Sequence, residues 1–77
     1  MNITLLLFGQ LTDITGTDTL LLEEIVDTDN LVKRLQENYP AFIHSKYLIA
    51  VNKKVISANT PLTDNCTIAL LPPFSGG

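Results

Sequence analysis

The residues with the clearest chemical potential are the last two of the sequence, Gly76 and Gly77. Glycine has no Cβ, so a pair of glycines can enter a slot that is too narrow for side chains. The reactive group that such an ending presents is the α-carboxylate of Gly77. We therefore interpret Gly77 as the candidate site of chemistry and the residues before it as the segment that carries this carboxylate.

The preceding segment, Pro72-Pro73-Phe74-Ser75, contains no group that would perform this chemistry. Ser75 has no neighbouring histidine or lysine to activate it as a nucleophile. When extended, residues 72–77 reach roughly 20 Å, and the two prolines favour that extended form. Leu71 and Phe74 are candidate apolar anchors at a partner interface. We expect the catalytic groups to come from another protein, into whose active site this tail inserts.

Size and composition indicate one small folded domain. The chain has 77 residues, of which 45% are hydrophobic and 17% charged, which is enough apolar material for a core. The net charge of −3 and the pI near 4.7 exclude a basic nucleic-acid-binding surface. An acidic surface of this kind suits a partner that has a basic docking face.

The sequence also bears on compartment and cofactors. A single cysteine, Cys66, excludes an internal disulfide framework, and no metal-binding motif is present. There is neither a signal-peptide pattern nor an apolar run long enough to span a bilayer. The sequence contains no glycine-rich phosphate loop, so we expect no bound cofactor and no ATP site. We expect a cytoplasmic protein that binds neither nucleic acid nor membrane.

Two strands are expected in the first third of the chain. Residues 2–8 are so apolar that they predict a strand covered on both faces, which ends at Gly9. Residues 10–18 read as a connection with room for one short helical turn. Residues 19–25 predict a second strand, with Leu20 and Leu22 on one face.

One helix and three strands are expected in the remainder. The helix begins after Asp27 or Thr28 as N-cap and ends near Asn38, because Pro40 cannot continue it. Leu31, Val32 and Leu35 form its expected buried stripe. Residues 47–51 and 54–57 predict a hairpin that turns at Asn52-Lys53, and 66–71 predict the last strand.

This order predicts an α+β fold in which one main helix packs on one face of a mixed sheet. We expect a folded domain over residues 1–71 and a flexible C-terminal tail over residues 72–77. Because the last predicted strand runs directly into the tail, the tail leaves from a rigid element.

The whole chain resembles the ubiquitin-like sulfur-carrier proteins, specifically the type that forms the small subunit of molybdopterin synthase (MoaD type). The resemblance rests on five segments, and the last of them separates this type from the thiazole-synthesis carriers of the same MoaD/ThiS family. They are Leu7-Phe8-Gly9, Gly16-Thr17-Asp18, Ala50-Val51-Asn52, Pro61-Leu62-Thr63-Asp64 and Pro72-Pro73-Phe74-Ser75-Gly76-Gly77. The resemblance implies a β-grasp fold.

The resemblance also implies a function. An adenylyltransferase similar to ubiquitin-activating enzymes would use ATP to adenylate Gly77, and a persulfide system would then convert it to a thiocarboxylate. The thiocarboxylate would donate sulfur to cyclic pyranopterin monophosphate in the large subunit of molybdopterin synthase. The chain would then be non-catalytic by itself, in a heterotetramer whose catalytic residues lie on two large subunits.

Two other functions remain open at this point. The chain can be a sulfur carrier for thiazole or another cofactor. It can also be a ubiquitin-like modifier, whose tail forms isopeptide bonds, or a plain interaction domain. The fate of the Gly77 carboxylate distinguishes these functions.

Overall fold

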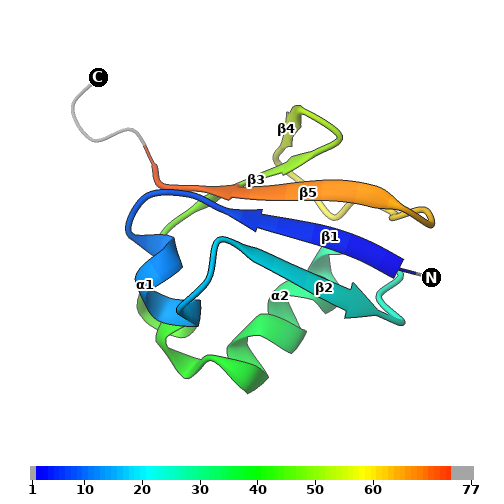
Figure 1. Cartoon of the computed structure of the whole chain (residues 1–77). Helices are drawn as coiled ribbons and strands as arrows, with labels where there is room; N and C mark the ends of the chain where they lie inside the picture. The colour runs from blue at the N-terminus through cyan, green and yellow to red at the C-terminus, as the bar shows by residue number, and fades with distance from the viewer. Residues whose placement is uncertain (1, 74–77) are drawn as a thin grey trace.

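The computed structural model describes residues 2–73, which form one sheet with helices against it (Figure 1). In chain order the elements are β1 (Asn2–Leu7), α1 (Leu11–Thr15), β2 (Thr19–Glu23), α2 (Thr28–Asn38), the 3-10 helix η1 (Pro40–His44), β3 (Leu48–Val51), β4 (Lys54–Ile56) and β5 (Cys66–Leu71).

The five strands form a mixed sheet in the order β2-β1-β5-β3-β4. The first and last strands, β1 and β5, pair in parallel at its centre, and the other three pairings are antiparallel. Parallel neighbours need a crossover connection, and here the helices supply it. The predicted α+β, β-grasp architecture with a helix across one face of a mixed sheet is confirmed.

The core lies on the face of the sheet that the helices cover (Figure 1). Ile3, Leu5 and Leu7 of β1 are almost completely buried there, and so are Leu31 and Leu35 of α2. The short helices complete the same core with two further buried side chains, which are Leu11 of α1 and Phe42 of η1.

The expectation that residues 2–8 form a strand covered on both faces is wrong. Thr4 and Leu6 lie on the opposite face of β1 and are only half-buried. Helices pack on one face of the sheet alone, so the apolar residues of the other face stay partly open to solvent. Their apolar character therefore needs another explanation, which the candidate site supplies.

Left-handed backbone conformations end several elements. Glu24 has φ 62° and ends β2 two residues earlier than expected. Asn52 and Lys53, with φ 48° and 74°, form the predicted two-residue hairpin turn, since this turn type requires positive φ at both positions. Asn65, with φ 64°, leads into β5.

The start of α2 is fixed by hydrogen bonds to the segment before β5. The Asp27 carboxylate caps the helix by accepting from the Asn30 N–H at 2.9 Å. Oδ1 of the Asn59 side chain accepts from the Asp29 N–H at 2.8 Å, and Nδ2 of the same side chain donates to the Asp27 carboxylate at 3.3 Å. The Thr60 N–H donates to the Thr28 hydroxyl at 2.9 Å. The bonds from the Asn30 and Asp29 N–H groups satisfy donors that a helix start leaves unpaired, and the other two hold the segment before β5 in place.

This network predicts a dependence of stability on pH. The Asn30 N–H lowers the pKa of Asp27 from its ordinary value of 3.8, and the side chains of Asn30 and Asn59 lower it further. Because the folded-state pKa is the lower one, the stabilisation is present above the unfolded-state pKa and is lost as the pH falls through the folded-state pKa. The Asp27→Asn variant has no carboxylate to titrate at this position, so we expect its stability deficit relative to the native chain to be constant near neutral pH and to shrink in acid.

Urea unfolding of the native chain and the Asp27→Asn variant over a pH series measures this difference directly. A deficit that stays unchanged from about pH 7 to about pH 2 would contradict the assigned role of the carboxylate.

Candidate functional site

The candidate site begins where β5 ends, at Leu71, and the chain continues into Pro72 and Pro73. Leu71 and Pro72 are half-buried, and Pro73 is exposed. The predicted tail residues Phe74, Ser75, Gly76 and Gly77 lie outside the described residues. The structure therefore describes the base from which the predicted tail leaves, at the end of the central strand (Figure 1).

Gly9 packs directly against the base of the tail. It has φ +58°, and a Cβ at this position would lie 2.7 Å from Cγ of Pro72, closer than two such carbons can approach. The parallel pairing of β1 and β5 brings the two residues together, since the Phe8 N–H still donates to the Leu70 carbonyl at 3.2 Å. Gly9 thus leaves room for the Pro72 ring and helps to set where the tail starts.

The open face of the sheet carries an apolar patch next to this base. The strand register pairs Leu6 with Ala69, Ala69 with Ala50, and Ala50 with Val55. Residues that are paired across neighbouring strands lie on the same face of the sheet. Leu48 pairs with Leu71 on the same face, and Phe8 follows by strand alternation. We define the apolar patch as Leu6, Phe8, Leu48, Ala50, Val55, Ala69 and Leu71.

Two members of the patch are large side chains exposed to solvent, with exposed fractions of 44% for Phe8 and 55% for Val55. Ala50 is only 5% exposed although it lies outside the core cluster, because its neighbours on this face enclose it. A contiguous exposed patch rimmed by polar residues is typical of an interaction surface. Of the two predicted anchors, Leu71 belongs to this patch and Phe74 lies outside the described residues.

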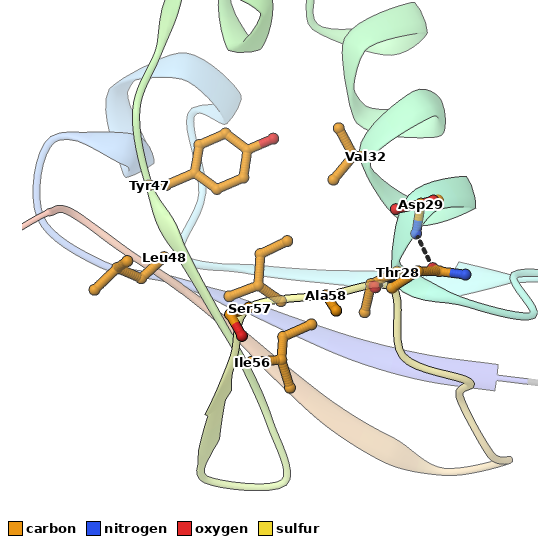
Figure 2. A pocket seen from close by; sticks show the side chains of 10 residues that line it. Thr28, Asp29, Val32, Tyr47, Leu48, Ile56, Ser57 and Ala58 are labelled. Carbon is orange, nitrogen blue, oxygen red and sulfur yellow. Dashed lines mark hydrogen bonds between the residues drawn. The ribbon is translucent and has the colours of Figure 1, made fainter.

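A separate hollow of about 250 Å³ lies between the start of α2 and the end of the β3–β4 hairpin. Figure 2 shows Tyr47 and Val32 on its walls, with the hydrogen bond from the Asp29 N–H to the side chain of Asn59 at one end. Val32 was predicted to belong to the buried stripe of the helix, and beside this hollow it is half-buried. Burial raises the pKa of the Tyr47 phenol above 10.0, which makes the phenol less ready to give up its proton. The polar groups at this end of the hollow already cap α2.

Other chemically active side chains are few among the described residues. Cys66 is 3% exposed and packs in the core. Over residues 2–73, no group of three or more histidine, cysteine or acidic side chains is arranged to hold a metal ion. Within the same range, no helix has the length and apolarity to cross a membrane.

Sheet order, helix placement and the emergence of a tail from the central strand define the chain as a ubiquitin-like β-grasp domain. The family model described as the ThiS family matches residues 5–77, and the chain belongs to that family. It is 31% identical to a molybdopterin synthase sulfur carrier subunit of Dictyostelium discoideum over 80 residues, which cover 95% of this chain and 93% of that protein.

Two solved structures extend this similarity. One is the protein–protein complex of subunits 1 and 2 of the molybdopterin-converting factor from Helicobacter pylori, in which the matching chain has 31% identity, full coverage of both chains and a TM-score of 0.73. The other is small archaeal modifier protein 1 from Methanosarcina acetivorans, with 26% identity, coverage of 99% of this chain and 96% of that chain, and a TM-score of 0.82.

The contact between Gly9 and Pro72 yields a prediction with an internal control. Gly16 has φ +75° but would place a Cβ in open space, so Gly16→Ala reports the cost of positive φ alone, about 1–2 kcal/mol. Gly9→Ala carries that cost and also collides with the Pro72 ring. We expect Gly9→Ala to lower the free energy of unfolding further than Gly16→Ala does.

A second substitution tests whether Pro72 causes the difference. Pro72→Ala removes the ring carbon in question, so the double variant Gly9→Ala/Pro72→Ala is expected to be less destabilised than the two single variants together predict. Denaturant unfolding gives the free energy of unfolding of these four variants and of the native chain. Equal destabilisation by the two glycine substitutions, with additive behaviour of the double variant, would show that the contact has no energetic weight.

Proposed function

We propose that this chain is the sulfur-carrier small subunit of a molybdopterin synthase. The observation that carries the proposal is the 31% identity, over nearly the whole chain, to a protein of that name. The geometry supports it, because a rigid central strand ends beside Gly9 and an apolar interaction surface adjoins the start of the tail.

The reaction at Gly77 begins with the activation of a carboxylate, which is by itself a poor acylating agent. Its oxygen attacks the α-phosphate of ATP on an adenylyltransferase similar to ubiquitin-activating enzymes, which gives an acyl-adenylate and releases pyrophosphate. The terminal sulfur of a persulfide then displaces AMP. A thiol cleaves the resulting acyl disulfide, so that a thiocarboxylate remains on Gly77 and a disulfide forms on the donor side.

Delivery returns the carrier to its starting state. The thiocarboxylate sulfur attacks an oxygen-bearing carbon of cyclic pyranopterin monophosphate in the active site of a large subunit, and the carbon–oxygen bond at that carbon breaks so that the oxygen leaves. Water then hydrolyses the acyl bond. Sulfur passes to the product, and Gly77 regains its carboxylate with an oxygen from water. The chain itself holds no cofactor in this scheme, because ATP binds to the activating enzyme, and both partners act in the cytoplasm.

The apolar patch is the proposed surface for the large subunit. It lies on the face that no helix covers, and Leu71 connects it directly to the base of the tail. A subunit that covers the patch would receive the tail in the same contact. This arrangement explains why apolar side chains such as Phe8 and Val55 remain exposed in a chain of 77 residues. A heterotetramer, with one small subunit on each of two large ones, fits a patch that is used once per chain.

A charge placed in the patch is expected to weaken this assembly. Val55→Lys puts a cation where an apolar side chain would be buried, and we expect the affinity for the large subunit to fall at least tenfold. Leu21→Lys is the matched control, because Leu21 is also a large exposed apolar residue on an edge strand and the same face but lies outside the patch. Calorimetric titration measures both. Equal binding by the Val55→Lys variant and the native chain would exclude the patch as the interface.

A ubiquitin-like modifier is the second candidate function, and the 26% identity to small archaeal modifier protein 1 favours it. Sulfur carriage and protein modification share the acyl-adenylate and differ in the nucleophile that attacks it. A lysine amine gives an isopeptide bond, whereas a persulfide gives a thiocarboxylate. Sulfur carriage for thiazole or another cofactor would use the same thiocarboxylate with a different acceptor.

Intact-mass measurement distinguishes these outcomes. The chain is incubated with ATP, the activating enzyme and a persulfide donor, and a variant that lacks Gly76 and Gly77 serves as the control. We expect the native chain to gain the mass of one oxygen-to-sulfur exchange and the truncated chain to remain unchanged. Attachment to lysines of other proteins without that exchange would favour the modifier.

A further inference from the structure

The outer edge of β2 is a free sheet edge with its backbone groups in a defined orientation. Leu7 donates its N–H to the Asp18 carbonyl at 2.9 Å, which makes this a hydrogen-bonded pair of the antiparallel ladder. Hydrogen-bonded and non-hydrogen-bonded pairs alternate along such a ladder, so the backbone N–H and C=O groups of Leu20 and Leu22 point toward β1. The N–H and C=O groups of Thr19, Leu21 and Glu23 therefore point outward, away from the sheet.

One contact confirms this orientation and also shortens the part of the edge that another strand can use. Nη1 of Arg34, on α2, donates to the outward-pointing carbonyl of Glu23 at 3.5 Å. The Thr17 hydroxyl donates to the Thr19 carbonyl at 3.3 Å and accepts from the Thr19 N–H at 3.4 Å, and both are long bonds that a partner strand can replace. The outward groups of Leu21 have no such partner among the described residues, and no described strand pairs with β2 on this side. The guanidinium marks the end of the segment that another strand can use.

The opposite edge of the sheet is much less able to accept a strand. β4 has only three residues and begins with Lys54, and both features are common protections of a sheet edge. A two-residue turn is flanked by a hydrogen-bonded pair, here Val51 with Lys54, so Lys54 directs its backbone groups toward β3. Because the orientation alternates, Val55 is the residue of β4 whose N–H and C=O groups point outward. β2 is longer, with five residues, and its charged residue Glu23 stands at its end, so its three consecutive leucines form the middle of the edge.

The side chains around this edge indicate what binds there. Leu21 is 79% exposed and lies on the open face, paired with Thr4, outside the apolar patch. Asp18 precedes β2, and Glu23 and Glu24 end it beside the single cation of Arg34, so both ends of the edge carry net negative charge. An occupant needs an apolar side chain beside Leu21 and basic side chains near its own ends.

From these features we infer that the edge of β2 binds an extended segment of a partner protein, with apolar residues in its middle and basic residues on both sides. Backbone hydrogen bonds to Thr19 and Leu21 would add a sixth strand to the sheet. A second copy of this chain fits poorly, since antiparallel pairing centred on Leu21 would bring Asp18 of one copy near Glu24 of the other. β1 separates this edge from β5, so the tail and the patch stay available to other partners.

A synthetic peptide tests the inference. The probe is an N-acetylated, C-amidated nonapeptide of sequence Arg-Lys-Ile-Thr-Val-Thr-Ile-Lys-Arg, added to the ¹⁵N-labelled chain. We expect its binding to slow the solvent exchange of the Leu21 amide, whose outward N–H has no partner among the described residues. A control peptide with glutamate in place of each arginine and lysine is expected to bind at least tenfold more weakly.

Two variants locate the binding. Leu21→Lys replaces the apolar contact with a charge that repels the probe, and we expect at least a tenfold loss of affinity. Val55→Lys, the same kind of change on the opposite edge strand, is expected to leave probe binding unchanged, although it weakens assembly with the large subunit. This inference is therefore tested independently of the proposed function.

Three results would overturn it. The first is the absence of saturable probe binding. The second is binding that shifts the resonances of the apolar patch and is lost in the Val55→Lys variant instead. The third is sedimentation of the free chain as a dimer that the Leu21→Lys variant abolishes, since the edge would then be occupied by a second copy.

Discussion

The parallel pairing of β1 with β5 is the interaction on which the rest of the structure depends. It joins the first strand to the last at the centre of the sheet, and its buried residues Leu5, Ile68 and Leu70 lie at the middle of the core. The same pairing brings Gly9, just beyond the end of β1, against Pro72, just beyond the end of β5. The central strand pair of the sheet thus sets the starting point of the tail.

The elements were predictable because local signals and tertiary packing agree in this chain. Asp27 caps α2, Pro40 ends it, and the Asn52-Lys53 turn sets the hairpin register, each through an effect that acts over a few residues. The end of β2 was misplaced because a positive φ at Glu24 is unusual for glutamate and has no signal in the sequence. The expectation that both faces of β1 are covered was also wrong, because the apolar residues of a strand can belong to an interface as well as to a core.

The candidate site was only partly predictable, because it combines residues that are far apart in the sequence. Leu71 was expected as an anchor from its place beside the tail, whereas Phe8 and Val55 meet it only through pairings of three different strands. An available signal was the pair of apolar residues at alternate positions of the second face near one end of β5, Ala69 and Leu71. The packing of Gly9 against Pro72 had no such signal, because it depends on the relative position of two chain segments.

The central claim is that Gly77 carries sulfur to a pterin substrate, and a single-turnover transfer tests it most directly. The chain is loaded with a radiolabelled thiocarboxylate and mixed with the large subunit of molybdopterin synthase and cyclic pyranopterin monophosphate. The label is expected to move into the pterin product, and Gly77 is expected to return to a carboxylate. A label that stays on the chain, or is released only as sulfide at the rate seen without the large subunit, would contradict it.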